Sequence, residues 1–402
     1  MKKVVKFVLG MAALGCVVAG THVNSAQNRV ETYAKADMVV EKEQNFLNIS
    51  AKSAYLMDYH SKTPIFENHA DLRLPIASMC KIMTLMLTFD EIRAGNLSFD
   101  EEICVSERAA SMGGSQVFLE PNAKYKVREL IKSIVICSAN DSCVALAEKI
   151  AGSESLFVEK MNEKAKEIGA NNTLFANCTG LPKEPQYSCA KDVAIMLAKL
   201  LENDEYYEFG KVWMDRFEHP KGRYTEISNT NKLVRFYDGC DGGKTGFTNE
   251  AGFCLAATAK RDNTRVISVV IGEKERKQRF DDVRTMFDYA FANYATKAVV
   301  QEGVPLDEKA IVEGGKSEKI AVAPQRAAYV FLKRGEQGGK VHFELRLKRV
   351  KAPCKKGDFV GEMLIYKDGV EVESVPLIAY ENVGKANLFD CIQDVAEEWN
   401  KR

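Results

Sequence analysis

The sequence predicts an α/β domain built on an antiparallel sheet, followed by a small all-β domain. The first half of the chain carries long apolar segments with helical spacing, and from Cys240 onward the apolar period changes to two. A second period-two region begins near Val299. Helices between blocks of strands are typical of an α/β domain, whereas strands alone indicate a separate β domain.

Five segments before the β domain are long and apolar enough to form helices. Short strands at residues 45–60 come before them. The last helix follows the main block of strands and is expected to pack across the sheet. The expected helices span residues 76–89, 127–150, 154–168, 190–201 and 280–296.

Alternating residues and turn signals predict the strands. Residues 253–258 alternate with period two, and residues 265–271 form a β-branched run. In the second domain, residues 341–348 alternate cleanly, which predicts a half-buried strand. Asp368-Gly369 separates two apolar runs and is a strong signal for a hairpin turn.

The N-terminus has the pattern of a secretory signal peptide. Lys2, Lys3 and Lys6 precede an apolar run, and small and polar residues follow it up to Ala26. The run is shorter than the roughly 20 apolar residues that a membrane-spanning helix needs. We therefore expect a signal peptide at residues 1–26, a main domain at 27–298, a β-rich domain at 299–384 and an amphipathic tail at 385–402.

The amphipathic tail has an acidic polar face. Leu388, Ile392 and Trp399 fall on its apolar face. Helices that lie on anionic membranes usually carry a basic polar face instead. Two interpretations stay open, a helix that caps the fold and a peripheral membrane contact.

Composition excludes several classes of function. The formal net charge is zero and no long basic run occurs, so nucleic acid is not an expected partner. The eleven cysteines form no C-x-x-C pair and few histidines occur, so we expect no metal site. Most cysteines lie among apolar residues and are expected to be free, buried thiols, while their pairing outside the cell stays open. The absence of H-E-x-x-H and G-x-S-x-G removes support for zinc peptidases and α/β-hydrolases.

Three short motifs carry the chemistry, and the first is Ser78-Met79-Cys80-Lys81. Residues three apart share one face of a helix, so the Lys81 amine would lie beside the Ser78 hydroxyl. A serine hydroxyl is a weak nucleophile until a base takes its proton. Apolar neighbours such as Met83 would bury Lys81 and lower its pKa, which favours the neutral amine. The spacing predicts Ser78 as a nucleophile and Lys81 as its base.

The other two motifs place polar groups in apolar surroundings. Ser138 and Asn140 follow a long apolar segment, where unsatisfied polar side chains would be costly. They fit a proton relay and a substrate-binding amide, although a helix break with local capping would also explain them. Lys244-Thr245-Gly246 begins a strand, where glycine is disfavoured unless another backbone approaches closely. We expect a substrate peptide to be that backbone, with Lys244 and Thr245 binding its terminal carboxylate.

In this order the motifs form the set found in penicillin-binding proteins and class A β-lactamases. The stretches Pro75 to Thr84 and Asp241 to Thr248, and Lys356-Gly357-Asp358, extend the match. Over about residues 45–385 the chain resembles the D-alanyl-D-alanine carboxypeptidases, which are low-molecular-mass penicillin-binding proteins of the serine peptidase type. The resemblance implies a penicillin-binding, β-lactamase-like catalytic domain with a β-rich second domain.

The resemblance also implies roles for single residues. Ser78 would form the acyl-enzyme with Lys81 as its base, and Ser138 and Lys244 would assist proton transfer. The backbone N–H groups of Ser78 and Phe247 would form the oxyanion hole. Arg279 stands where similar enzymes keep a carboxylate-binding arginine. The implied substrate-binding residues are Asn140, Lys244, Thr245, Gly246, Phe247 and Arg279.

Two positions depart from the pattern of the family. Cys80 stands where threonine is common, which places a thiol beside the base and suggests sensitivity to oxidation. Thr179 stands where many relatives have histidine. The surrounding stretch, Asn177 to Pro182, is similar to that of sporulation-associated members.

These features predict a secreted carboxypeptidase that removes the terminal D-alanine from peptidoglycan stem peptides. We expect it to be acylated by β-lactams and to need no cofactor. A β-lactamase shares the motifs, but no E-x-x-L-N, the deacylating motif of class A enzymes, follows Ser138. A penicillin or peptidoglycan sensor with little hydrolysis is a further alternative, left open by Cys80 and Thr179.

Overall fold

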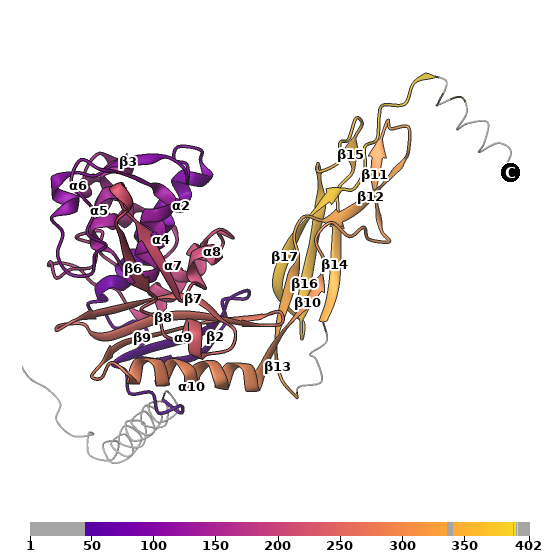
Figure 1. Cartoon of the computed structure of the whole chain (residues 1–402). Coiled ribbons are helices and arrows are strands. Elements are labelled where there is room, and N and C mark those ends of the chain that lie inside the picture. The colour runs from indigo at the N-terminus through magenta and orange to yellow at the C-terminus, as the bar shows by residue number, and fades with distance from the viewer. Residues whose placement is uncertain (1–44, 336–340, 389, 391, 393–402) are drawn as a thin grey trace, which may run out of the picture. The chain divides into compact units, whose positions relative to one another are not determined.

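The computed structural model describes residues 45–335, 341–388, 390 and 392 (Figure 1). The signal peptide expected at 1–26 and most of the tail expected at 385–402 lie outside these residues. Residues 45–49 belong to a separate compact unit and form a short turn. There the side-chain oxygen of Asn45 accepts the backbone N–H of Ile49 at 2.8 Å.

A five-stranded antiparallel sheet forms the centre of the larger domain. Its strand order is β2-β1-β9-β8-β7, so β7 is an edge strand. The predicted strands at 253–258 and 265–271 are confirmed as parts of β8 and β9. The strands of this sheet are β1 (Ser53–Asp58), β2 (Pro64–Asn68), β7 (Cys240–Thr248), β8 (Gly252–Arg261) and β9 (Thr264–Glu273).

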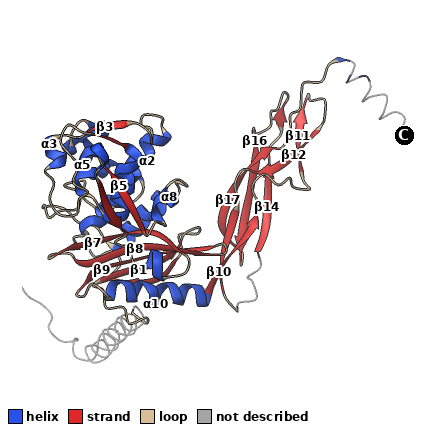
Figure 2. Ribbon diagram, in the orientation of Figure 1, coloured by secondary structure: helices blue, strands red, loops and turns tan. Residues whose placement is uncertain are grey.

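Helices cover both faces of the sheet (Figure 2). α10 (Gln278–Asn293) packs on β8 and β9 from one face, as expected for the helix after the strand block. α7 (Ala190–Leu200) packs on β1 and β9 from the other face. Because both faces are covered, polar side chains such as Thr258 and Ser268 are as buried as their apolar neighbours. The period-two pattern therefore located these strands correctly, but it did not indicate that one face of the sheet is exposed to solvent.

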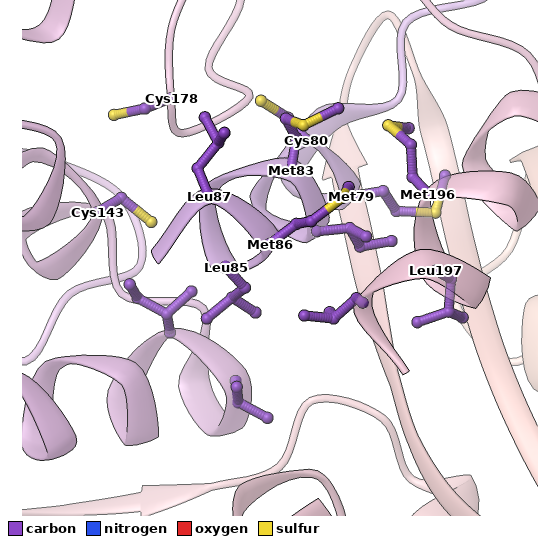
Figure 3. Close-up of a cluster of buried hydrophobic side chains, with 14 of the residues drawn as sticks. Met79, Cys80, Met83, Leu85, Met86, Leu87, Cys143, Cys178, Met196 and Leu197 are labelled. Carbon is purple, nitrogen blue, oxygen red and sulfur yellow. The ribbon is translucent and has the colours of Figure 1, made fainter. Parts of the chain in front are cut away.

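The core around α2 (Lys81–Arg93) is rich in sulfur (Figure 3). α2 is buried on every side from Lys81 to Phe89 and packs against α5 and α7. Unbranched methionines and small thiols fill the irregular gaps between crossing helices. The sulfur-bearing side chains drawn in Figure 3 include Met79, Cys80, Met83, Met86, Cys143, Cys178 and Met196.

The segment 127–150 forms two helices, so the expectation of a single helix is wrong. α4 (Val127–Cys137) ends at Ser138, whose backbone is left-handed with a φ of +67°. α5 (Asn140–Ala151) begins two residues later. A left-handed residue ends a helix because it turns the chain off the helical path. The joint places Ser138 between the two helices and Asn140 at the first position of α5.

The other expected helices are confirmed, with shifts at their ends. The segment at 76–89 begins as a 3₁₀ turn, η1 (Ala77–Cys80), and continues as α2 to Arg93. α6 (Glu154–Glu167) is capped by Ser153, whose hydroxyl accepts the Leu156 N–H at 3.3 Å. α10 ends at Asn293 rather than at 296, because strand β10 begins there. Short helices are α3 (Glu107–Ala110), α8 (Tyr206–Gly210), η2 (Pro220–Gly222) and α9 (Leu233–Phe236).

Strands dominate the described residues after α10. Six of them form a sheet with the order β14-β16-β17-β12-β11-β15. β16 and β17 form the expected hairpin, and Asp368 and Gly369 have the positive φ values, +53° and +82°, that such a turn requires. The expected half-buried strand at 341–348 is confirmed as β14: Val341, Leu345 and Leu347 are partly buried against the core of this region, whereas Phe343 is 46% exposed.

The remaining strands belong to this region or to small two-stranded sheets. The pairs β3–β4 and β5–β6 lie among the helices of the larger domain, and β10 pairs with β13. These strands are β3 (Glu102–Cys104), β4 (Lys124–Lys126), β5 (Met214–Glu218), β6 (Tyr224–Ser228), β10 (Tyr294–Val300), β11 (Lys309–Glu313), β12 (Lys319–Pro324), β13 (Ala328–Lys333), β14 (Val341–Leu347), β15 (Val350–Lys351), β16 (Phe359–Lys367) and β17 (Val370–Ala379).

The predicted fold class is confirmed, an α/β domain on an antiparallel sheet with an all-β C-terminal region. The cysteines that the structure describes are free thiols, and most are buried, as expected. Cys104 is the exposed exception among them. Across the described ranges, no helix has the length and apolar character needed to cross a membrane.

Candidate active site

Ser78 lies in the tight turn η1 at the start of α2. It is half-buried, between the buried residues Ala77 and Met79. Ala77 has a φ of +47°, a left-handed conformation that is uncommon for a residue with a side chain. Backbone strain of this kind is found mainly at functional sites. The turn keeps the serine accessible while the helix behind it stays in the core.

Lys81 meets Ser78 from the first turn of α2. Its Nζ donates to Ser78 Oγ at 2.9 Å and to the backbone carbonyl of Thr179 at 2.5 Å. The side chain is completely buried, and this burial lowers the pKa of the Lys81 ammonium. A base with reduced proton affinity thus lies within hydrogen-bonding distance of a hydroxyl, the geometry that general-base activation needs.

A turn at residues 177–181 supplies the second acceptor for Lys81. The side-chain oxygen of Asn177 accepts the backbone N–H groups of Thr179 at 3.1 Å and Gly180 at 2.7 Å. Gly180 lies against η1 so closely that a Cβ there would sit 2.0 Å from the Ala77 carbonyl oxygen. Thr179 contributes its main-chain oxygen, so threonine in place of histidine keeps this contact. Asn177 belongs to none of the three motifs, so its role was not predicted from the sequence.

Cys80 is shielded from solvent and does not face the site opening. Its thiol is completely buried and donates to the Asn177 carbonyl at 3.2 Å. Burial raises the pKa of the Cys80 thiol far above its usual range. Oxidants react with accessible thiolates, so a buried, protonated thiol is a poor target. This environment gives no support to the expected sensitivity to oxidation.

Ser138 and Asn140, at the joint between α4 and α5, have buried oxygens without partners. Asn140 is held by Nδ2, which donates to the Gly113 carbonyl at 2.7 Å, and by its backbone N–H, which donates to the Ser115 carbonyl at 2.7 Å. Within the described residues, neither Ser138 Oγ nor Asn140 Oδ1 has a hydrogen-bond partner. An unsatisfied buried polar group costs about 1–3 kcal/mol. Neither side chain caps an adjacent helix, so the capping explanation loses its support.

Asp141 is a site residue that the sequence analysis did not single out. Its buried carboxylate accepts the backbone N–H groups of Val117 and Leu119, each at 3.1 Å. Burial raises the pKa of Asp141. These bonds fix the loop whose carbonyls hold Asn140. The position of Asp141 directly after the Ser-Ala-Asn motif was the one signal in the sequence.

β7 brings the third motif to the same place. Lys244 is buried, and its Nζ donates to the Thr245 carbonyl at 3.2 Å. Burial lowers the pKa of Lys244 well below its usual value, and the charge of Lys81 lowers it further. A Cβ on Gly246 would lie 2.6 Å from the Ile76 carbonyl oxygen. The close approach of the chain before η1 is therefore enough to require a glycine at 246, a cause that the sequence did not indicate.

Phe247 and Arg279 surround the end of β7. Phe247 is 50% exposed and stacks on Phe253, with ring centroids 4.3 Å apart. Arg279 of α10 is buried, and its Nη1 donates to the carbonyls of Gly246 at 3.1 Å and Cys254 at 3.2 Å. Burial lowers the pKa of Arg279 to about 10. The guanidinium therefore supports the backbone of the strand, and binding of a carboxylate would use its remaining N–H groups.

A pocket of 360 Å³ opens beside the turn that carries the serine. It lies where η1, the turn at 177–181 and the end of β7 meet. The pocket is lined by Pro75, Ile76, Ala77, Gly180, Pro182, Lys183, Glu184, Gln186, Thr248 and Glu250.

Among the residues that the structure describes, no group of three or more metal-binding side chains occurs.

Comparison with known families and proteins identifies this arrangement. Residues 38–275 match the family described as D-alanyl-D-alanine carboxypeptidase, and residues 294–385 match the C-terminal domain of penicillin-binding protein 5. D-alanyl-D-alanine carboxypeptidase DacF of Bacillus subtilis is 38% identical over 370 residues, which are 92% of this chain and 94% of the relative. DacC of Escherichia coli is 32% identical over 370 residues, 90% of this chain and 91% of the relative.

Solved structures of relatives share the fold. Penicillin-binding protein 5 from Haemophilus influenzae matches with a TM-score of 0.67 and 30% identity, over 84% of this chain and 98% of that one. Penicillin-binding protein D2 from Listeria monocytogenes, solved in its ampicillin-bound form, matches with a TM-score of 0.55 and 29% identity, over 60% of this chain and 98% of that one. The chain thus belongs to the D-alanyl-D-alanine carboxypeptidases, the serine peptidases among the low-molecular-mass penicillin-binding proteins.

Proposed function

We propose that the protein removes the terminal D-alanine from peptidoglycan stem peptides through an acyl-enzyme on Ser78. The observation that carries this proposal is the pairing of Ser78 with Lys81, a buried amine of lowered pKa that donates to the hydroxyl at 2.9 Å. Membership of the carboxypeptidase family supplies the reaction and the class of substrate.

In the proposed acylation, the Ser78 hydroxyl loses a proton, and an ester bond to Ser78 replaces the peptide bond to the last D-alanine. Lys81, as the neutral amine, takes the proton of Ser78 while Oγ attacks the carbonyl carbon of the penultimate D-alanine. The backbone N–H groups of Ser78 and Phe247 would stabilise the oxyanion, and losing one such donor typically costs about 10²–10³ in rate. The bond to the last D-alanine then breaks, and its amine takes a proton from Lys81 through Ser138. Water hydrolyses the ester and restores Ser78.

The proposed substrate contacts use the groups that the fold leaves open. Asn140 Oδ1, which is buried and unpartnered in the described chain, would accept an N–H of the substrate. Lys244 and Thr245 would bind the terminal carboxylate, because charge-assisted hydrogen bonds to an ammonium are strong. An extended peptide would add as a strand along the edge of β7, next to Gly246. Arg279 would assist through its remaining N–H groups.

We also propose that β-lactams inhibit the protein covalently. Their ring amide resembles the D-alanyl-D-alanine bond, so Ser78 would open it and keep the product as an ester. One solved relative carries ampicillin. The added β region and the missing E-x-x-L-N argue against fast hydrolysis of that ester, and therefore against a β-lactamase. The complete set of motifs argues against a sensor that only binds penicillin.

The biological setting is proposed from the sequence. A signal peptide at 1–26 would carry the protein out of the cytoplasm, where peptidoglycan lies. We propose a catalytic domain at 27–298, a β-rich domain at 299–384 and a tail at 385–402 that either caps the fold or contacts the membrane peripherally. The similarity of residues 177–182 to sporulation-associated members suggests a role in sporulation.

Mass spectrometry of the protein treated with benzylpenicillin tests the acyl-enzyme. We expect one adduct, on Ser78, that lasts for minutes or longer, together with D-alanine release from a peptide ending in D-Ala-D-Ala. Rapid loss of the adduct with turnover of penicillin would establish a β-lactamase instead. A stable adduct without peptide hydrolysis would establish a sensor. A folded protein that forms no adduct would contradict all three functions.

A further inference from the structure

β7 begins with a β-bulge directly before the Lys-Thr-Gly motif. The pairing of β7 with β8 shifts between Cys240 and Gly242, which leaves Asp241 as the extra residue. A bulge bends its strand and redirects the side chains that follow, and bulges are common beside active sites. The direction in which Lys244 leaves the strand therefore depends on how residues 241–243 are held.

Tyr206 of α8 is completely buried and contacts this bulge. Its hydroxyl accepts the backbone N–H of Gly243 at 2.9 Å. Its ring lies so close to Gly242 and Gly210 that a Cβ on these glycines would sit 2.8 Å and 3.0 Å from ring carbon Cε1. Gly243 has a φ of +128°, and a Cβ there would lie 2.2 Å from the Ala256 carbonyl oxygen. The backbone just before the motif is thus restrained by both the ring and the hydroxyl of one tyrosine.

Two other side chains hold the earlier part of the bulge. Arg265 of β9 donates to both carboxylate oxygens of Asp241, at 2.8 Å each. Asn231 Nδ2 donates to the Gly242 carbonyl at 3.1 Å. The Arg265 bonds hold the Asp241 side chain, and the Asn231 bond holds the carbonyl of the Gly242–Gly243 peptide. The Tyr206 hydroxyl holds the N–H of that same peptide, which lies one peptide before Lys244.

We propose that Tyr206 is a positioning residue for Lys244. Without the hydroxyl, the buried Gly243 N–H would lose its acceptor, and its peptide, still held at the Gly242 carbonyl by Asn231, would rotate about that bond to find another one. That rotation would turn the Lys244 side chain away from the site. The inference rests on the proposed role of Lys244 in proton transfer and carboxylate binding.

The test compares two neighbouring tyrosines on α8. Tyr206→Phe removes one hydroxyl and keeps the ring against the glycines. Tyr207→Phe is the matched control, because it removes a hydroxyl that donates to the Leu201 carbonyl at 3.2 Å and keeps the ring that lies against Arg265. We expect Tyr206→Phe to slow acylation of Ser78 by a fluorescent penicillin about tenfold, the size of one buried hydrogen bond. Tyr207→Phe should acylate at the wild-type rate.

A double-mutant cycle separates positioning from a general loss of stability. If Tyr206 acts through Lys244, adding Tyr206→Phe to Lys244→Met should slow acylation no further. If the double variant is slower by the product of the two single-variant factors, the inference is overturned, because Tyr206 would then act independently of Lys244. An unchanged rate in the Tyr206→Phe single variant would overturn it as well. A wild-type protein that is not acylated at all would instead refute the proposed function, on which the inference depends.

Discussion

The two lysines of the site are both buried, yet they are held in different ways. Lys81, on the helical side, donates to the Ser78 hydroxyl at 2.9 Å and to the Thr179 carbonyl at 2.5 Å. Lys244, on the edge strand β7, donates to the Thr245 carbonyl at 3.2 Å and, within the described residues, to no other recorded acceptor. An ammonium has three N–H donors. Lys81 is therefore oriented before a substrate arrives, whereas Lys244 keeps donors for an incoming group.

The electrostatic surroundings of the two lysines also differ. Burial lowers the pKa of both, but the charge of Lys81 lowers the pKa of Lys244 further. When Lys81 is protonated, its charge and that of Lys244 repel each other, so an anion that binds at Lys244 would relieve the repulsion. This difference supports the proposal that Lys81, on the helical side of the site, is the base and that Lys244, on the strand side, binds the carboxylate.

The largest expected effect separates these two roles. Lys81→Met should slow acylation by penicillin by about 10²–10⁴, the range that general acid–base catalysis contributes. Lys244→Met should cost about ten- to a hundredfold, the size of hydrogen bonds to a charged group, and should raise KM for a peptide with a free terminal carboxylate. Rates of labelling by a fluorescent penicillin and of D-alanine release measure both losses.

Thermal unfolding is the control for these two variants. Methionine fills a similar volume without a buried amine, so Tm should stay the same or rise in both. A larger loss of acylation in Lys244→Met than in Lys81→Met, with both proteins folded, would reverse the assignment.

The pH dependence of acylation should distinguish the two lysines by a smaller effect. Because burial lowers the pKa of Lys81 below the ordinary lysine value of 10.5, the neutral amine forms at lower pH. The rate of acylation should therefore rise with pH, with a midpoint below pH 10.5. The Lys244→Met variant should keep this rise, whereas the residual activity of Lys81→Met should lack it. Between the lowered pKa and 10.5 the unfolded chain binds more protons, so the free energy of unfolding should also rise with pH. A pH limb that survives in Lys81→Met would point to another base.

Short-range chemistry made much of the fold and site predictable from the sequence. Asp368-Gly369 marks its hairpin because few residues accept positive φ at both positions of the turn. The Ser-x-x-Lys spacing places Ser78 and Lys81 on one helical face, and the structure joins them by a hydrogen bond. In both cases the deciding interaction lies within a few residues of the chain.

The features that the sequence did not reveal depend on contacts between distant segments. The break at Ser138 was only an alternative in the sequence, because helical periodicity continues across it and favoured a single helix. Gly246 is required by the approach of Ile76, about 170 positions earlier in the chain. Asn177 accepts a backbone N–H in the turn beside Lys81, and Tyr206 accepts one just before Lys244. Neither residue is part of a recognisable sequence motif, so neither could be singled out.

D-alanine release from a synthetic peptide ending in D-Ala-D-Ala, compared between the wild type and Ser78→Ala, is the sharpest test of Ser78 as the nucleophile of a carboxypeptidase. We expect steady release by the wild type and none by Ser78→Ala, with equal thermal stability of the two proteins. Release that persists in a folded Ser78→Ala variant, or no release from a folded wild type, would contradict this expectation.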